Sequence, residues 1–382
     1  MASMAKGKKG KARLLSYQQP LPLGMQERAR TARVVHRVKS EHQDIAVVEH
    51  GSGKSSDVRL VIDGELQFSS VDEYRYHECL VHPAIALASS LPARGASGLR
   101  VLLLGAGDGL AAREVLKHPA VEAIDIVDLD ADVTDLCRAG TPRTIRRLVQ
   151  LCENAFGSPK VTLHTTDALS FLTQRRLGSA TADSGSRGDC SSWDVVIMDL
   201  PDPTTEPLAQ LYTIEFFATA LGGLRPEGGV LVTHGGDIFA NGSAFWTIVR
   251  TLRAAVATAG AQHIEYGVAT YPSTVPSFGV WGFALACTSR AALAHSETGH
   301  TEQGADADPP PPKTAFPLKS VMQSDEVAGH LANIPCRFLT ERSLGGLFDL
   351  SPDVSEPVGI MDCPNATRVW MKCGWGCRGK EK

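Results

Sequence analysis

The sequence predicts an α/β protein with a parallel sheet that carries helices on both faces, preceded by a small antiparallel β unit. Residues 99–290 alternate strand-like and helix-like segments, which is the pattern of a parallel sheet with crossover helices. Within them, residues 100–107 (RVLLLGAG) form a continuous apolar run, as expected of a strand buried on both faces. The antiparallel unit is predicted at about 41–70, where short β-branched stretches flank the turn signal Asp63-Gly64.

The elements follow from the length and apolar spacing of each segment. The predicted strands are residues 100–107, 123–130, 161–165, 194–200, 229–236 and 280–287. The predicted helices are residues 72–89, 109–118, 131–139, 211–224 and 244–260. A further short strand and helix are expected within residues 335–348, packing back on the sheet.

Changes in composition divide the chain. Residues 1–40 carry ten Lys and Arg against one Glu, which is typical of a basic, disordered tail. Residues 178–192 and 293–315 are mostly small, polar or proline-rich, as in flexible insertions and linkers. The predicted organisation is a tail (1–40), a small β domain (41–75), a main α/β domain (76–292) with an insertion (178–192), a flexible linker (293–315) and a C-terminal extension (316–382).

The composition argues against several classes of protein. The chain of 382 residues has a net charge of -4, whereas nucleic-acid-binding domains are usually strongly basic. No apolar run approaches the ~18 residues that span a bilayer, and Met1–Arg13 lacks the apolar core of a secretory signal. The nine cysteines are scattered, and Cys373 and Cys377 lack an evident fourth metal ligand. We expect a cytoplasmic protein without a metal, and neither nucleic acid nor a membrane as its partner.

A glycine-rich loop follows the first strand of the main domain. Gly105 and Gly107 allow the backbone to turn tightly and to approach a ligand without a clash at Cβ. The third glycine of a dinucleotide fingerprint is missing, and Asp108 places a carboxylate where a pyrophosphate would lie. The loop therefore favours a cationic ligand, such as a sulfonium nucleoside or an ammonium group, over NAD.

Two further acids follow the next strands. Asp128 lies 21 residues after Gly107 and ends the second strand, where a carboxylate can accept hydrogen bonds from ribose hydroxyls. Asp167 ends the third strand, where adenine contacts usually fall. Each acid alone could be a solvated strand end or a helix N-cap. Together with Asp108 they favour a nucleoside site.

The fourth strand runs into Asp199-Leu200-Pro201-Asp202-Pro203, a loop that two prolines stiffen. Ligands of open α/β sheets bind at the carboxyl ends of the strands. Asp202 could instead cap a helix, but a cap does not explain Asp199. Carboxylates crowded in one cleft are costly unless a cation joins them, so a sulfonium and a polyamine are the expected ligands. An attacking amine must be neutral, so one carboxylate is expected to act as a general base.

Several segments, in the same order, resemble the spermidine/spermine synthase family, the polyamine aminopropyltransferases. The resemblance runs from about Gln43 to about Phe283, with a gap at residues 178–192. The segments that carry it are HQDI, DEYRYHECLVHPAI, VLLLGAGDG, AAREVLKHPAVEAIDIVDLD, DALSFL, VVIMDLPDP, QLYTIEFF and VPSFGVWGF.

The resemblance implies a fold, an assembly and a reaction. The fold is a class I methyltransferase-like Rossmann sheet preceded by a small antiparallel β domain, and the assembly is a homodimer or homotetramer. The reaction moves the aminopropyl group of decarboxylated S-adenosylmethionine to a polyamine acceptor, converting putrescine to spermidine and releasing methylthioadenosine. Decarboxylated S-adenosylmethionine is then a co-substrate, and no cofactor or metal is implied.

The resemblance also implies roles for individual residues. Asp199 is expected to be the catalytic base. The acceptor amine or the aminopropyl arm is expected to contact Tyr76, His77, Asp108, Asp202, Tyr212 and Phe278, with Glu78 nearby. The nucleoside is expected to contact Gln43, Gly105, Gly107, Asp128, Asp167 and Ala168.

The chain departs from the usual spermidine synthase pattern at three places. Ala106 replaces a glycine, Leu200-Pro201 replace two serines, and the acceptor-side tyrosine falls near Phe278 or at Tyr271. The DLPDP, QLYT and VPSF segments resemble thermospermine synthases, so a thermospermine or spermine synthase that uses spermidine is one alternative. An S-adenosylmethionine-dependent methyltransferase on the same fold is a second, and a non-catalytic paralogue is a third.

Overall fold

The computed structural model describes residues 32–51, 53, 56–91, 98–139, 146–181, 192–226, 228–259, 267–287 and 318–349. Residues 1–31 of the predicted tail lie outside these residues. So do the whole predicted linker and the cysteine-containing end of the chain. So do residues 182–191 of the predicted insertion. Residues 178–181, which were assigned to that insertion, instead form the last turn of helix α6.

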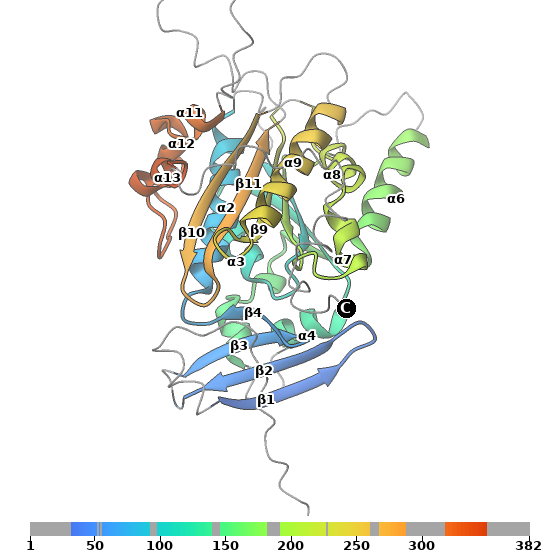
Figure 1. Ribbon diagram of the computed structural model, residues 1–382, viewed down its shortest axis with the longest axis vertical. Helices are drawn as coiled ribbons and strands as arrows, with labels where there is room; N and C mark the ends of the chain where they lie inside the picture. The colour runs from blue at the N-terminus through green and yellow to red at the C-terminus, as the bar shows by residue number, and fades with distance from the viewer. Residues whose placement is uncertain are drawn as a thin grey trace, which may run out of the picture.

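A seven-stranded sheet forms the centre of the main domain, in the order β10-β11-β9-β8-β5-β6-β7 (Figure 1). Five strands are parallel: β5 (Leu99–Gly105), β6 (Val121–Asp128), β7 (Val161–Thr165), β8 (Val195–Asp199) and β9 (Val230–Asp237). An antiparallel hairpin, β10 (Gly267–Val275) and β11 (Gly279–Cys287), completes one edge. The six predicted strands and the mainly parallel sheet are confirmed, and the last predicted strand, β11, belongs to the antiparallel edge.

Strand β10 escaped prediction because Pro272 lies in its middle. Proline has no backbone N–H to donate and usually signals a loop, but an edge strand tolerates it. β10 pairs only with β11, where Pro272 lies opposite Gly282.

The two faces of the sheet carry separate apolar cores. In the central strand β5, Val101 and Leu103 pack under α2 and α3, while Leu102 and Leu104 pack under the helices of the other face. Because both sets are fully buried, this strand is an uninterrupted apolar run, as predicted. The first face carries α2 (Glu73–Ser90) and α3 (Leu110–Leu116), and the second carries α6 (Ala168–Thr181), α8 (Ile214–Leu221) and α9 (Gly242–Ala259).

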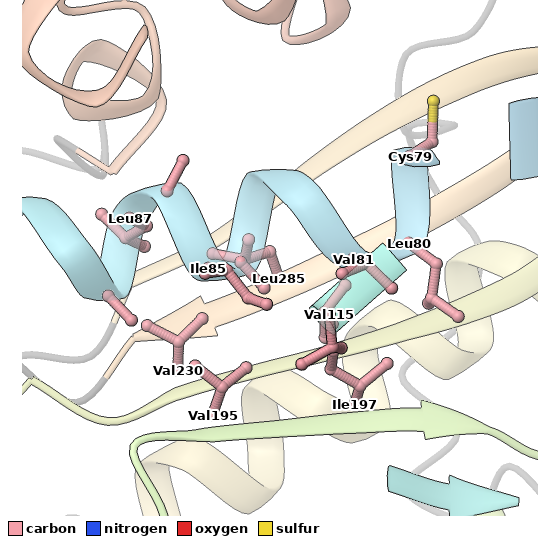
Figure 2. Close-up of a cluster of buried hydrophobic side chains, with 14 of the residues drawn as sticks. Cys79, Leu80, Val81, Ile85, Leu87, Val115, Val195, Ile197, Val230 and Leu285 are labelled. Atoms are coloured by element: carbon pink, nitrogen blue, oxygen red, sulfur yellow. The ribbon is translucent and has the colours of Figure 1, made fainter. Parts of the chain in front are cut away.

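Helix α2 is the element that brings the first site residues to the sheet. Figure 2 shows its apolar side chains over strands β8, β9 and β11, with Val81 and Ile85 facing Ile197 and Leu285. Each side chain of this size contributes about 1.5–3 kcal/mol when fully buried. The packing fixes the helix on the sheet, with Tyr76 reaching the carboxyl end of β8. Because α2 begins at Glu73, the main domain begins slightly before the predicted boundary at residue 76.

The N-terminal domain is a four-stranded antiparallel sheet below the central one in Figure 1. Its strands are β1 (Ala32–Lys39), β2 (Asp44–His50), β3 (Asp57–Ile62) and β4 (Glu65–Ser69). One side of it packs on α4 (Ala131–Ala139) and α5 (Arg146–Leu151). The antiparallel domain is therefore confirmed.

The disordered tail was predicted too long, since residues 32–39 form strand β1. Val35 and Val38 pack against the apolar cluster of the sheet. Arg33 pairs with Glu49 of β2, and Arg37 pairs with Asp44. The basic composition of the segment suggested disorder, because the apolar and acidic side chains that contact it lie in other strands, such as β2.

Three short helices of the C-terminal extension cover the outer side of α2 and β10: α11 (Leu318–Met322), α12 (Asp325–Gly329) and α13 (Glu341–Leu347). Leu318, Met322, Leu344 and Phe348 join the same core as α2. The helix predicted within residues 335–348 is confirmed as α13, but residues 335–340 form no strand. Among the residues that the structure describes, no helix is long and apolar enough to cross a membrane.

Candidate functional site

The acids that were predicted from strand ends gather at the carboxyl edge of the central sheet. Asp199 is the last residue of β8, and its Oδ1 accepts a hydrogen bond of 2.7 Å from the hydroxyl of Tyr76. Burial, followed by the charge of Asp199, raises the pKa of Tyr76 well above its usual value. The phenol therefore stays protonated and orients one oxygen of Asp199.

His77 lies beside this pair as a buried cation. Its Nδ1 is 2.8 Å from the backbone oxygen of Glu73 and 3.1 Å from Glu73 Oε2. Burial alone lowers the pKa of His77, but the bond to Glu73 and the charges of Asp108, Glu73 and Asp199 raise it to about 9. Arg113 holds Glu73 through two bonds of 3.0 and 2.8 Å. A positively charged imidazole at this place would repel an ammonium group. His77 therefore suits the role of a counter-ion for the acids better than the predicted role of an amine ligand.

Asp108 follows the glycine loop and faces His77. Burial, together with the charge of Asp199, raises the pKa of Asp108 to about 6, although His77 lowers it. Its Oδ1 accepts the backbone N–H of Leu110 at 2.8 Å, so part of the carboxylate caps helix α3. The charges of Asp108 and His77 therefore influence each other: each lies close enough to shift the pKa of the other.

The glycines of the loop are needed for close approach to the two neighbouring strand ends. Gly105 has φ +82°, and a Cβ there would overlap the backbone oxygen of Asp199. A Cβ on Gly107 would overlap Oδ2 of Asp128. Ala106 also has a positive φ of 65°, a conformation that costs an alanine more than a glycine. The loop thus touches both predicted acids directly.

The predicted nucleoside side is ordered around Asp128. Its Oδ2 accepts the N–H of Gly107 and its Oδ1 accepts the N–H of Asp130, both at 2.9 Å. Ser40 bonds Asp130 Oδ2 at 2.6 Å and also holds the backbone of Gln43. These bonds bring the β1–β2 turn, and Gln43 with it, to the end of β6.

Asp167 and Ala168 lie at the start of helix α6. Asp167 Oδ1 accepts the N–H of Ser170 at 2.8 Å, the hydrogen bond of an N-cap. Asp167 is exposed, whereas Ala168 is buried. Asp167 is therefore a helix N-cap, as the alternative interpretation of the sequence allowed. The cap uses one of its two carboxylate oxygens.

The loop between Asp199 and Asp202 is fixed through a single carbonyl. The backbone oxygen of Leu200 accepts hydrogen bonds from the hydroxyl of Tyr212 at 3.0 Å and from Nε2 of His234 at 2.6 Å. Tyr212 is 1% exposed and supports the loop, while its expected contact with the acceptor stays a prediction. Leu200, one of the two residues that replace serines, is buried in the second core.

Asp202 is the least satisfied acid of the site. Its Oδ1 is buried and has no hydrogen-bond partner among the described residues, although Nδ1 of His234 lies 3.6 Å away. The side chain as a whole is 32% exposed, so the carboxylate lies at the edge of the site. Burial raises the pKa of Asp202, which His234 partly offsets.

Aromatic rings pack around the ring of Tyr76. The ring centroids of His234, Phe278 and Trp281 lie 5.8, 6.1 and 6.4 Å from that of Tyr76. Asp72 accepts two hydrogen bonds from Ser277, at 2.6 and 2.9 Å, which fix the β10–β11 turn that carries Phe278. Phe278 therefore lies beside Tyr76, while its expected contact with the acceptor stays a prediction.

Tyr271 and Glu78, by contrast, face away from the site. Tyr271 is buried, stacks on Phe283 and donates to the backbone oxygen of Cys79 at 2.9 Å. The carboxylate of Glu78 accepts hydrogen bonds from backbone N–H groups of residues 337–339 in the C-terminal segment. The sequence reasoning missed His234 and Trp281, although His234 follows an apolar run just as Asp199 does. Within the described part of the chain, no cluster of His, Cys, Asp or Glu could hold a metal ion.

Comparison with solved structures identifies the class of this fold. Two solved structures cover 86% of the chain and 88% of their own length: a spermidine synthase in complex with the transition-state analogue AdoDATO (TM-score 0.59, 20% identity) and the spermidine synthase of Thermotoga maritima (TM-score 0.60, 21% identity). At this identity the likeness concerns the fold alone, and it confirms the methyltransferase-like arrangement.

The sequence shows the family. Residues 73–290 match the spermine/spermidine synthase domain, and the chain belongs to this family. It is 36% identical over 284 residues to a polyamine aminopropyltransferase of Oceanobacillus iheyensis, covering 74% of this chain and 48% of the relative. It is 40% identical over 248 residues to that of Mycobacterium tuberculosis, covering 65% and 39%. The chain thus spans about half the length of the curated relatives it matches, or less.

Proposed function

We propose that the protein is a polyamine aminopropyltransferase that uses decarboxylated S-adenosylmethionine and converts putrescine to spermidine. The observation that carries the proposal is Asp199 at the end of β8, oriented by Tyr76 and followed by the unpartnered carboxylate oxygen of Asp202. A neutralised amine and a second ammonium group would satisfy both acids. The names of the relatives, polyamine aminopropyltransferases, support the same reaction.

The mechanism is a direct displacement. Asp199 takes a proton from the acceptor amine, whose lone pair then attacks the methylene carbon bonded to the sulfonium. The carbon–sulfur bond breaks, its electron pair stays on sulfur, and methylthioadenosine leaves as a neutral thioether. Tyr76 keeps the base in place, so the protein contributes mainly positioning and deprotonation.

His77 sets the charge of this pocket. A cation beside Asp108 and Asp199 lowers the tendency of a bound nitrogen to hold a proton. It therefore favours delivery of the attacking amine in the neutral form that the displacement needs. Asp202, further along the loop, is left as the partner of the distal ammonium group.

On the nucleoside side, Asp128 would bind the ribose and the start of α6 would lie at adenine. Gln43, Gly105, Gly107, Asp167 and Ala168 complete this proposed set, and the contacts of Asp128 with the glycine loop support it. The carboxylate of Asp108 disfavours the methionine carboxylate of S-adenosylmethionine. Tighter binding of S-adenosylmethionine than of its decarboxylated form would favour the methyltransferase alternative.

The acceptor is the part of the proposal that needs a direct experiment. Putrescine and spermidine are offered separately with decarboxylated S-adenosylmethionine, and the length of the product amine is measured. We expect spermidine from putrescine. The phenyl ring of Phe278 beside Tyr76 is the observation that keeps a spermidine-using thermospermine or spermine synthase as the second candidate. If no product forms with putrescine, spermidine or spermine, the reaction is refuted and the non-catalytic paralogue is the remaining alternative.

Two further properties are proposed from the family resemblance. The protein acts in the cytoplasm, and it assembles as a homodimer or homotetramer. Light scattering coupled to size-exclusion chromatography tests the assembly, and a monomer at micromolar concentration would contradict it.

A further inference from the structure

His234 is a buried side chain in the second half of β9 that lies against the Leu200 loop, Trp281 and Asp202. Its Nε2 lies 2.6 Å from the backbone oxygen of Leu200, in the loop that joins the two carboxylates. Its Nδ1 lies 3.3 Å from the indole nitrogen of Trp281 and 3.6 Å from Oδ1 of Asp202. The imidazole and indole rings are stacked, with an interplanar angle of 27°.

These partners determine where the imidazole carries its proton. A carbonyl oxygen can only accept, so Nε2 must carry a hydrogen to bond Leu200. An indole N–H can only donate, so Nδ1 must offer its lone pair to Trp281. Together the two bonds select the neutral imidazole with its proton on Nε2. In this tautomer Nδ1 has no proton to give to Asp202.

The tautomer explains why Asp202 Oδ1 is buried without a donor among the described residues. A buried carboxylate oxygen without a hydrogen bond is costly, so it binds a suitable donor readily when one arrives. Protonated His234 would be such a donor, because Nδ1–H at 3.6 Å would turn to Asp202 and leave Trp281. Trp281 therefore keeps the oxygen available by occupying the nitrogen that could satisfy it.

We propose that His234 is a positioning residue, held by Trp281 in the Nε2–H tautomer, which anchors the Leu200 loop and leaves Asp202 Oδ1 free for the ammonium group of the acceptor. The inference rests on the proposed aminopropyl transfer and extends it to acceptor affinity. A proton on His234 and the ammonium group of the amine then compete for one oxygen. Amine binding should weaken in acid while nucleoside binding does not.

The groups that face His234 from each packed element favour this competition. Asp202 approaches from the loop after β8, and Tyr76, bonded to Asp199, approaches from α2. Glu65, at the start of β4, lies close enough to Asp202 that burial and the charge of Asp202 raise the pKa of Glu65. Trp281 of β11 supplies a neutral N–H donor to the imidazole, whereas the acids all favour the protonated ring.

The substitution Trp281→Phe tests the proposal, because it keeps an aromatic ring and removes the indole N–H. Without that donor the neutral tautomer loses a bond, and protonated His234 paired with Asp202 gains in population. We expect the KM for the amine to rise about fivefold at about pH 6 and less than about twofold at about pH 8.5. The KM for decarboxylated S-adenosylmethionine should stay unchanged. Equal effects at both pH values, or on both substrates, would overturn the proposal.

The substitution His234→Gln gives the complementary result. A glutamine amide can still donate to Leu200, but it cannot take a proton in this pH range. The rise of the amine KM in acid should therefore be smaller than in the wild type, and an unchanged profile would contradict the role of His234. Asp108 is present in the wild type and in all variants, so its own effect on the pH dependence is the same in each and does not change the difference between them. His164→Gln, at a histidine paired with Asp125 at 2.8 Å outside the site, is the matched control.

A readout without turnover separates this inference from the proposed reaction. Nitrogen-15 NMR of the histidine rings, assigned by comparison with His234→Gln, should show a protonated Nε2 and an unprotonated Nδ1 at about pH 8. In Trp281→Phe, which lacks the indole donor, the preference for this tautomer should be weaker than in the wild type. The opposite tautomer would overturn the inference even in an active enzyme. Inactivity of the wild type toward amines would refute the reaction and leave the tautomer result standing.

Discussion

Two buried carboxylates, Glu78 and Asp202, differ in how completely the protein satisfies them. Glu78 is fully buried and accepts three backbone N–H groups, from Arg337, Phe338 and Leu339, at 2.5, 2.8 and 2.8 Å. Asp202 has a buried oxygen with no hydrogen-bond partner in the described part of the chain. Native proteins rarely leave such an atom unpaired without a reason. The comparison indicates that Glu78 holds the structure together, whereas the unpartnered oxygen of Asp202 supports the proposal that it binds the amine.

The satisfied carboxylate belongs to a clamp on the helix that carries Tyr76. The guanidinium of Arg337 lies 3.8 Å from the ring centroid of Tyr74, and that of Arg75 lies 4.5 Å from the ring of Phe338. Both aromatic contacts flank the bonds to Glu78. The C-terminal segment, about 260 residues away in sequence, thus fixes the start of α2. The clamp and the site lie on successive residues of one helix.

The largest effect is expected from Asp199→Asn, on the ligand side of the comparison. Asparagine keeps an oxygen for the Tyr76 hydroxyl but loses the base and the charge. The barrier should rise by about 3–5 kcal/mol, measured as kcat for methylthioadenosine release. Thermal unfolding should be nearly unchanged. Near-normal turnover would remove Asp199 from the mechanism.

The substitution Glu78→Gln should instead act on stability. The amide keeps the shape, loses the charge and turns a donor toward the backbone N–H groups. We expect a loss of about 2–4 kcal/mol in the free energy of unfolding, measured by urea denaturation. The exposed Glu326→Gln, on α12 of the same segment, is the control and should change it by less than about 0.5 kcal/mol. Equal stabilities of the two variants would show that Glu78 is not a clamp.

The pH dependence of stability should reveal the cation of the site. The pKa of His77 is raised from 6.5 to about 9 in the folded protein. Its contribution to stability is therefore fully present below about pH 6.5 and is lost as the pH rises through about 9. The free energy of unfolding of the wild type should fall across this window. In His77→Gln the fall should be smaller, and an identical slope would contradict a cationic His77.

The smallest effect is expected from Arg337→Ala, at the exposed edge of the clamp. The variant loses one cation–π contact with Tyr74 but keeps the backbone N–H that bonds Glu78. A loss of about 0.5–1 kcal/mol in unfolding free energy is expected, by the same urea titration. A loss as large as that of Glu78→Gln would show that the Arg337 guanidinium, and not the Glu78 carboxylate, provides most of the stabilisation.

The sequence predicted those features that depend on local pattern. Strands β5 and β8 are apolar runs, and Asp108, Asp128 and Asp199 lie at or just after strand ends, so the acidic edge of the sheet could be inferred. Strand β1 was hidden by its basic composition, because its apolar partners lie in other strands. Strand β10 was hidden by Pro272, because an edge position is visible only once the order of strands is known.

The parts of the site that were missed depend on contacts across the sheet. His234 and Trp281 meet because β9 and β11 are neighbours, which their positions in the chain do not reveal. Tyr212 was expected to contact the substrate, and the fold adds a hydrogen bond from its hydroxyl to the Leu200 carbonyl that the sequence does not reveal. Glu78 was expected near the substrate, but a helix turns successive side chains to different sides. Local motifs therefore located the acids, and only the fold distinguished their roles.

The central claim, that the unpartnered carboxylate is the amine site, is tested most directly by Asp202→Asn in a paired titration. Putrescine binding is measured by calorimetry in the presence of methylthioadenosine, and unfolding is measured on the same sample. Since burial raises the pKa of Asp202, its charge does not stabilise the fold, and removing it should leave stability equal or higher. We predict that amine affinity falls by about tenfold or more. Unchanged amine affinity together with a loss of stability like that of Glu78→Gln would contradict the account.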